Sequence, residues 1–414
     1  MSEHIHHLTP GRLQDPEAGY AGLRDGEGLP LVVLPGLRTP VRLVTRYEDV
    51  KAALTEPRLI RDRSEVPGGV DGPDAQEELL EPLGGLPSEY VRYVSGHLAF
   101  FDGEEHARRR APLTRAFTAR RIASLRAFVE ETVARLVGEL AGQEEADLLN
   151  EFAYPLATSV ICELVGVEEA DRDRVCEWIR DFAYGDGSRM SDGLAGIVEY
   201  VKSLIARRKT SPADDLITAL LEGAREGGAD ALTEDEIVAM VFLLINTGIT
   251  PPALFLAHAV LALLDHPDQL ARLRAEPELL DRAVPELLRH VTLLRIGASM
   301  YATEDFAFAG TELRKGEAVS VALLAANHDP AVYGGTPGRL DITREAERGK
   351  VHLAFGHGAH YCIGAALGSL VTGVVFDLLL VRRAVPQLAV AREDLEFGHW
   401  PGDGFHLLRL PVRL

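Results

Sequence analysis

The stretch from Ile237 to Leu264 carries no charged residue, and this long apolar run constrains the fold more than any other feature. A run of this length either spans a membrane or forms a helix buried in a protein core. Asn246 and the Pro251-Pro252 pair interrupt the run, and an acidic segment precedes it. Thr233 and Glu236 have the spacing of a capping box, which predicts a helix start there. We therefore expect a central core helix and no membrane partner.

Helical periodicity dominates the remaining chain, whereas β-type alternation is confined to short pieces. The helical runs are 47–54, 103–140, 151–165, 169–182, 194–208, 213–224 and 278–291. The strand-like pieces are 31–34, 41–45, 298–302, 306–308, 318–321, 387–390 and 406–410, and the first two are expected to form an edge hairpin. No linker or internal repeat divides the sequence. This pattern predicts a mainly α protein with a minor β part, folded as a single domain over residues 1–414.

The charge balance and the cysteine content exclude several functional classes. Lys and Arg number 43 against 63 Asp and Glu, and the resulting net charge of -20 repels nucleic acid and anionic membranes. The three cysteines form no disulfide framework, which is typical of a reduced cytoplasm. Residues 1–10 are polar and lack the apolar core of a signal peptide. We expect a cytoplasmic protein that does not bind nucleic acid.

A glycine-rich loop from Phe355 to Gly364 places Cys362 just before an apolar helical pattern. The amide groups and the dipole at a helix N-terminus stabilise a thiolate. Gly356, Gly358 and Gly364 allow positive φ or close approach to a flat ligand. Three interpretations remain open at this point: a buried structural cysteine, a zinc site, and a thiolate ligand of haem iron. The zinc site would draw on His352, His357, His360 and Cys362.

The pattern Phe355-x-x-Gly358-x-His360-x-Cys362-x-Gly364 resembles the haem-binding signature of the cytochrome P450 superfamily. The resemblance implies the P450 fold, a triangular helical bundle around haem b (iron protoporphyrin IX) with a small β-rich region. It also implies a monooxygenase that oxidises a mostly apolar small molecule, as in natural-product biosynthesis, with O2 and electrons from ferredoxin and ferredoxin reductase. Cys362 would be the axial iron ligand. The other cofactor-binding residues would be His106, Arg110, His360, Phe355, Gly356, Gly364 and Arg295.

Two further motifs agree with the resemblance. Glu286 and Arg289 have the spacing of the family's Glu-x-x-Arg pair, which implies a structural role with Arg339 as its partner. His106 and Arg110 are four residues apart on one predicted helix face, as in the family's helix that holds the haem propionates. The neighbouring arginines are expected to form an exposed basic patch that accepts an acidic ferredoxin. These are Arg108, Arg109, Arg115, Arg120 and Arg121.

The central helix departs from the family pattern on the oxygen side. Asn246 to Thr250 matches the family's Ala-Gly-x-Glu/Asp-Thr, but Ile249 stands where the acid is expected. Because this acid normally relays protons, we expect a water chain from Thr250, Thr247 and Asn246 to replace it. The proline pair after Thr250 predicts a kink. The expected pocket walls are Ile245, Ile249, Leu294, Ile296 and Trp400.

Two positions outside the central helix also depart from the family. Met300 replaces an arginine that often binds a haem propionate, and Gly368-Ser369 replaces a common Ala-Arg pair. Haem anchoring would then depend more on His106, Arg110 and His360, with Arg295 as a substitute. Hydroxylation is the expected reaction. The alternatives are oxidative coupling, desaturation, peroxide-driven chemistry, or a non-catalytic P450-like helper protein.

Overall fold

Helix α13, Glu234–Asp265, runs unbroken through the apolar stretch in the computed structural model, which describes residues 4–70, 72–74, 77–78, 81, 86–345, 351–383, 385–400 and 404–414. The capping box is confirmed: Thr233 Oγ1 accepts the Glu236 N–H at 3.2 Å, and Glu236 Oε2 accepts the Thr233 N–H at 2.7 Å. Leu148–Val165 and Glu234–Asp265 are long and apolar enough to cross a membrane, yet 72% and 67% of their most apolar windows are buried inside the fold. Both pack as core helices, as expected for α13.

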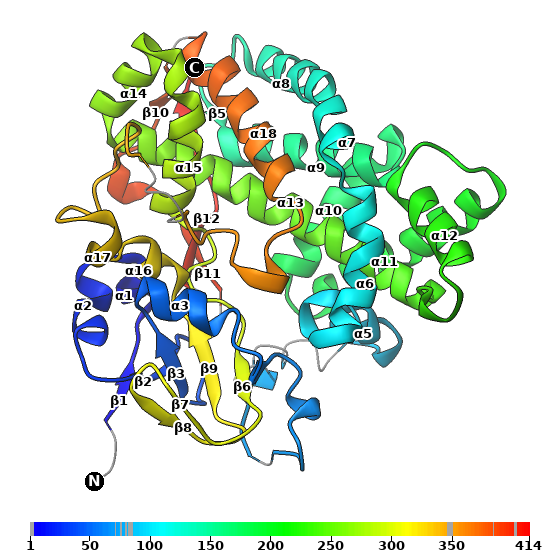
Figure 1. Ribbon diagram of the computed structural model, residues 1–414. Coiled ribbons are helices and arrows are strands. Elements are labelled where there is room, and N and C mark those ends of the chain that lie inside the picture. The colour runs from blue at the N-terminus through cyan, green and yellow to red at the C-terminus, as the bar shows by residue number, and fades with distance from the viewer. Residues whose placement is uncertain are drawn as a thin grey trace. The chain divides into compact units, whose positions relative to one another are not determined.

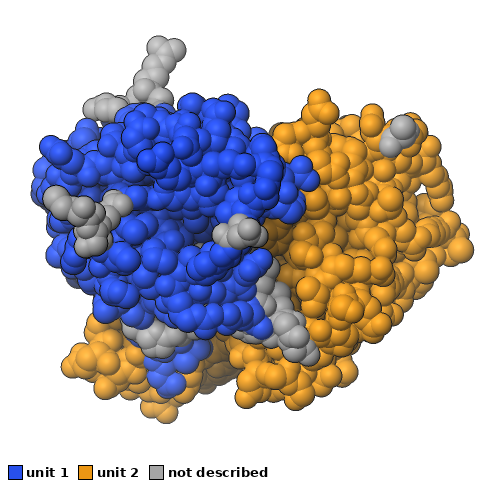
Figure 2. All heavy atoms as spheres, turned by 90° about the horizontal axis from the view of Figure 1, so that it is seen from below, with its two compact units in different colours: residues 1–81, 265–362, 396–408 blue, residues 82–264, 363–395, 409–414 orange. Residues whose placement is uncertain are grey.

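The chain divides into two compact units, each built from several segments (Figure 2). The first unit comprises residues 1–81, 265–362 and 396–408, and the second comprises residues 82–264, 363–395 and 409–414. A single domain over 1–414 stays a prediction, and each unit is described by itself.

The first unit contains the larger sheet, whose six strands have the order β1-β2-β3-β9-β6-β4. Their bounds are β1 Ile5–His7, β2 Leu31–Val33, β3 Val41–Val44, β9 Ala318–Val321, β6 Met300–Ala302 and β4 Leu59–Ile60. The predicted hairpin of β2 and β3 forms, but its expected position at an edge is wrong. β3 also pairs in parallel with β9, and β2 pairs in parallel with β1. Two small antiparallel ribbons complete the β part: β7 Phe306–Phe308 with β8 Thr311–Leu313, and β11 Phe397–Trp400 with β12 Gly404–Leu407.

Helices pack on this sheet through two apolar clusters. Tyr47 and Val50 of α3 belong to one cluster together with Val44 and Val319 of the sheet, and Figure 1 shows α3 beside the sheet. The other cluster joins the sheet to the N-terminal helices. The helices of the unit are α1 Pro10–Gln14, α2 Ala18–Arg24, α3 Tyr47–Ala53, α14 Pro267–Ala275, α15 Leu280–Val291, α16 Leu323–Asn327 and α17 Pro330–Tyr333.

The second unit is predominantly helical. Its helices are α5 Ser88–Ser95, α6 Gly103–Ala116, α7 Ala119–Ser124, α8 Arg126–Leu140, α9 Tyr154–Val165, α10 Arg172–Tyr184, α11 Gly187–Thr210, α12 Leu216–Glu226, α13 and α18 Ala365–Val375. β5 Ala146–Asp147, β13 Pro411–Arg413 and β10 Gln387–Leu388 form a three-stranded sheet. α9 and α13 approach closely at Gly248, where an added Cβ would lie 2.5 Å from Ile161 Cγ1. The mainly α class with a minor β part is confirmed.

Candidate functional site

The loop around Cys362 is fixed by its own backbone. The Gly356 N–H donates to Leu353 O at 2.9 Å, and the Cys362 N–H donates to Phe355 O at 2.9 Å. Gly356 and Gly358 have φ of 70° and 72°, a region in which side chains other than glycine are strained. A Cβ at Gly358 would also lie 2.8 Å from Leu54 O. The sequence therefore folds here into one defined turn.

The surroundings of Cys362 differ from those of the other described thiols. Cys362 is exposed, whereas Cys162 is buried and burial raises its pKa to about 12. An exposed thiol contradicts the interpretation of Cys362 as a buried structural cysteine. α18 begins at Ala365 with Gly364 as its N-cap, so Cys362 lies shortly before the helix start. Gly364 has φ of -83°, so of its two expected uses positive φ does not apply, and close approach to a flat ligand stays a prediction.

Aromatic rings surround the loop. The rings of Phe355 and Tyr361 are 6.4 Å apart, and the His352 ring is 5.6 Å from Phe355. His360 lies in the short 3-10 turn Gly358–His360 before Tyr361, which is 42% exposed. Across the described residues no group of three His, Cys, Asp or Glu side chains gathers as a metal site, so zinc gains no support. The loop thus presents an exposed thiol, a glycine at position 356 and flanking aromatic rings. This combination fits a planar apolar cofactor bound through sulfur.

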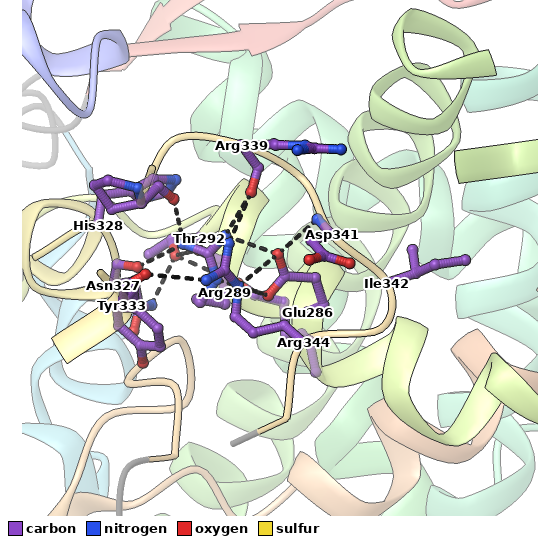
Figure 3. A network of polar contacts seen from close by, with 12 residues as sticks. Glu286, Arg289, Thr292, Asn327, His328, Tyr333, Arg339, Asp341, Ile342 and Arg344 are labelled. Carbon is purple, nitrogen blue, oxygen red and sulfur yellow. Dashed lines mark hydrogen bonds and ion pairs between the residues drawn. The ribbon is translucent and has the colours of Figure 1, made fainter. Parts of the chain in front are cut away.

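Glu286 and Arg289 of α15 form the centre of a buried polar network (Figure 3). Arg289 Nε and Nη2 donate to the two Glu286 oxygens at 2.7 and 2.8 Å, and both side chains are almost fully buried. The remaining Arg289 donors reach the carbonyls of Asn327 at 2.8 Å, Pro337 at 2.8 Å and Arg339 at 3.3 Å. The ion pair can be buried because the two charges neutralise each other and the Arg289 N–H groups donate to carbonyl and carboxylate oxygens.

The expected guanidinium partner, Arg339, is wrong. Arg339 contributes its carbonyl, and its side chain is exposed and points away from the network in Figure 3. Arg344 supplies the second guanidinium, because its Nε donates to Glu286 Oε1 at 3.2 Å and its Nη1 to Tyr333 O at 3.1 Å. Arg339 and Arg344 lie in the same irregular loop, and sequence reasoning missed Arg344 because no periodic signal tells which of the two guanidinium groups reaches Glu286. Asp341 adds a backbone N–H to Glu286 Oε1 at 3.0 Å.

The other predicted residues of the first unit lie in the segment 294–296 and in β11. Arg295 is buried, and its Nη1 donates to Leu293 O at 3.4 Å. Leu294 is 52% exposed, whereas Ile296 is buried in the cluster of the N-terminal helices. Trp400 lies in β11, and its side chain falls outside the described part of the structure. The exposed Leu294 side chain could therefore contact a ligand. Ile296 packs in the core, so its predicted role as a pocket wall is not supported.

In the second unit, His106 and Arg110 lie on α6, four residues apart as predicted. His106 is buried, and Arg110 is half-buried. Asp102 is the N-cap of this helix. A buried histidine with an arginine one turn later provides hydrogen-bond donors suited to a carboxylate ligand.

The expected basic patch is wrong for Arg108 and Arg109, and its member Arg121 pairs with Asp214 at 2.6 Å. Arg108 and Arg109 both pair with Glu105 and with Glu236 of α13. The Arg109 guanidinium also lies 4.0 Å from the centre of the Phe101 ring. Hydrogen bonds from Arg108 lower the pKa of Glu105 to about 2. These arginines join α6 to α13 and are neutralised, so they leave little positive charge for a partner.

The predicted oxygen-side residues lie in the middle of α13. Ile245 and Ile249 are fully buried, and Asn246 is half-buried. The Thr250 hydroxyl is buried and forms no well-oriented hydrogen bond with the described residues, although the Tyr154 hydroxyl lies near enough to interact with it. Thr247 is exposed, and its hydroxyl donates to Leu243 O at 2.7 Å, which leaves its oxygen able to accept a hydrogen bond from water. The place of Thr250, Asn246 and Thr247 in a water chain stays a prediction.

The sequence matches the family model described as Cytochrome P450 over residues 177–385. It is 38% identical to cytochrome P450 107B1 of Saccharopolyspora erythraea, with 93% of this chain and 91% of that protein covered. It is also 35% identical to the mycinamicin IV hydroxylase/epoxidase of Micromonospora griseorubida, with 90% and 88% covered. Among solved structures, the LnmA cytochrome P450 hydroxylase of the leinamycin biosynthetic pathway of Streptomyces atroolivaceus has a TM-score of 0.82 at 35% identity and covers 100% and 99% of the two chains.

Proposed function

From the premise that this chain belongs to the cytochrome P450 family, we propose that it holds haem b (iron protoporphyrin IX) through Cys362 and hydroxylates a mostly apolar small molecule in natural-product biosynthesis. The chain is a haem-thiolate oxidoreductase of the monooxygenase class, like its relatives. The observation that carries the assignment of Cys362 is its exposure in a turn that two positive-φ glycines define. Among the thiols that the structure describes, Cys362 alone is exposed.

Several residues of this chain would hold the haem. Cys362 would bind iron, and a thiolate ligand supplies electron density that favours O–O cleavage. His106, Arg110 and Arg295 would pair with the propionates, because each carries nitrogen donors in a buried or half-buried position. The loop residues would contact the macrocycle or its edge. These are Phe355, Gly356, His360 and Gly364.

The residues of α13 would serve the oxygen side. Thr250 offers a buried hydroxyl, and Asn246 offers an amide that donates and accepts hydrogen bonds. Ile249 is buried and cannot donate a proton, so protons would come through water held by Thr250 and Asn246. Leu294 would provide an exposed apolar wall for the substrate, whereas Ile245 and Ile249 are fully buried and, like Ile296, would belong to the core.

The electrons would come from ferredoxin and ferredoxin reductase, with O2 as the oxidant and the cytoplasm as the compartment. The charge of -20 agrees with a soluble protein that avoids membranes and nucleic acid. Arg108 and Arg109 are excluded as docking charges because they pair with Glu105 and Glu236. Exposed Arg120 and Arg115 remain available to an acidic partner.

Reconstitution with a screen of candidate metabolites tests this function. Metabolites from the neighbouring biosynthetic genes are added to the haem protein, and binding is followed by the spin-state shift of its absorption spectrum. Compounds that bind are then incubated with O2, ferredoxin, ferredoxin reductase and NADPH, and the products are analysed by mass spectrometry. We expect a product that has gained one oxygen atom. A product that has gained no oxygen would contradict hydroxylation. It would indicate oxidative coupling or desaturation, the alternatives that the absence of an acid at position 249 favours.

Two further outcomes of this experiment separate the remaining alternatives. Product formation with hydrogen peroxide that exceeds product formation with ferredoxin would assign peroxide-driven chemistry. A haem protein that binds no metabolite and turns over none would point to the non-catalytic helper.

A further inference from the structure

Asn327, the last residue of α16, is a fully buried amide that forms hydrogen bonds with Arg289, Thr292 and Leu353. Its carbonyl accepts from Arg289 Nη1 at 2.8 Å. Its side-chain Nδ2 donates to Thr292 Oγ1 at 2.7 Å, and its Oδ1 accepts the Leu353 N–H at 2.7 Å. One side chain therefore connects α15 to the segment that leads into the Cys362 loop.

Thr292, at the C-terminal end of α15, holds an uncommon backbone conformation. Its φ of 36° and ψ of 74° lie in the left-handed region, which β-branched residues rarely adopt. The side chain is fully buried, and its hydroxyl donates to Arg289 O at 2.6 Å while accepting from Asn327. Such a conformation persists only where surrounding contacts fix it. Here the contacts come from Arg289 and Asn327 (Figure 3).

Leu353 is the point at which this network reaches the loop. Its N–H binds Asn327, and its carbonyl accepts the Gly356 N–H at 2.9 Å. Phe355 follows two residues later, and its carbonyl accepts the Cys362 N–H at 2.9 Å. An unbroken series of hydrogen bonds and short covalent segments thus runs from Arg289 to Cys362 within the first unit.

We propose that Asn327 and Thr292 are positioning residues that hold the Cys362 loop by joining it to the Glu286–Arg289 pair. The inference rests on the proposed function of Cys362 as the thiolate ligand of haem. Without the amide, the Leu353 N–H loses its acceptor and Thr292 loses a contact that fixes its conformation. The loop then gains freedom, and the sulfur leaves its place at the iron more often.

The test uses substitutions that keep size and remove hydrogen bonds. Asn327→Leu removes both side-chain bonds, and Thr292→Val removes the hydroxyl while keeping a β-branched side chain. Thr292→Ser keeps the hydroxyl and serves as one control. Gln269→Met is a second control, because Gln269 is a buried amide in the same unit whose Oε1 accepts the Ile342 N–H at 3.1 Å. Ile342 follows Asp341, which binds Glu286, so this substitution disturbs the same network but leaves the hydrogen bond to Leu353 intact.

The readout is the Soret band of each reduced haem protein under carbon monoxide, with thermal unfolding measured in parallel. We expect the thiolate-type red-shifted fraction to fall at least twofold in Asn327→Leu and Thr292→Val after mild warming below the unfolding temperature. Thr292→Ser and Gln269→Met should keep the wild-type fraction, even if Gln269→Met unfolds at a lower temperature. If Asn327→Leu does not fold, Thr292→Val against Thr292→Ser decides the question.

Unchanged red-shifted fractions in Asn327→Leu and Thr292→Val would overturn the proposal, because a merely structural role lowers the unfolding temperature without moving the band. An equal loss in Gln269→Met would overturn it as well. A wild-type protein that shows no red-shifted band would instead refute the proposed function of Cys362. The two failures are therefore distinct.

Discussion

At the scale of single residues, burial decides what each ionisable group does. Burial holds the Cys162 thiol protonated, whereas Cys362 is exposed and open to a ligand. Arg289 remains charged in the core because Glu286 binds it through both oxygens. The spacing of Glu286 and Arg289 predicted this pair, but it did not identify Arg344, which reaches Glu286 from an irregular loop. Nor did any sequence signal mark Thr292, because a left-handed threonine depends on contacts made far along the chain.

The first prediction separates Arg344 from Arg339. Arg344→Ala removes a charged hydrogen bond to buried Glu286 and should lower the free energy of unfolding by about 2 kcal/mol. Arg339→Ala keeps the carbonyl that Arg289 uses and should change the free energy by less than about 0.5 kcal/mol. Urea unfolding of both variants provides the measurement. Equal losses would show that the Arg339 side chain belongs to the network.

The second prediction concerns pH and His328. Burial lowers the pKa of His328 well below 6.5, so the folded protein keeps this side chain neutral. The unfolded chain takes up a proton below about pH 6.5, and stability should therefore fall as the pH decreases from about 7.5 to about 5.5. His328→Gln removes the titrating group and should lose less stability over the same interval. Urea midpoints at both pH values test this, and identical losses in the two proteins would contradict it.

At the scale of elements, local signals predicted what local contacts determine. The capping box of α13 depends on Thr233 and Glu236 alone, and the structure confirms it. The edge position of β2 and β3 was wrong because β9, which pairs with β3, comes from a distant part of the sequence. The basic patch on α6 was wrong for a related reason. Its partner Glu236 lies on α13, and sequence spacing gives no information about contacts between these helices.

The third prediction tests the start of α13. Thr233→Ala removes the side-chain oxygen that accepts the Glu236 N–H and should cost about 1 kcal/mol of unfolding free energy. Thr233→Ser keeps that oxygen and should lower the free energy of unfolding by only about 0.3 kcal/mol. Urea denaturation distinguishes them. A similar cost for both substitutions would show that the cap contributes little.

The fourth prediction tests the junction of α6 and α13. Arg108→Glu places a third carboxylate beside Glu105 and Glu236 and should lower the unfolding free energy by about 2 kcal/mol or more. Arg120→Glu reverses an exposed charge and should change it by less than about 0.5 kcal/mol. Denaturation of both variants at equal ionic strength is the measurement. If Arg108→Glu leaves the free energy of unfolding unchanged, Arg108 does not depend on these carboxylates, and it would count again as a surface charge for a partner.

At the scale of the whole molecule, the family and the fold class followed from the sequence, because one loop pattern and one apolar helix are specific enough. The residues of the site could be predicted from the sequence only in part. The motif residues of the first unit gather around α15 and the Cys362 loop, whereas His106, Arg110 and Thr250 belong to the second unit. Periodicity does not show which residues hold the loop in place. Asn327 performs this task in the structure, through contacts with segments remote from it in sequence.

The most direct test of the central claim is the absorption spectrum of the reduced, haem-loaded protein under carbon monoxide, compared between the wild type and Cys362→Ser. A thiolate ligand predicts a strongly red-shifted Soret band in the wild type. That band should be absent from Cys362→Ser and retained in Cys162→Ser, whose thiol is buried and protonated. A haem-replete wild type without the band, or a Cys362→Ser variant that keeps it, would contradict the account.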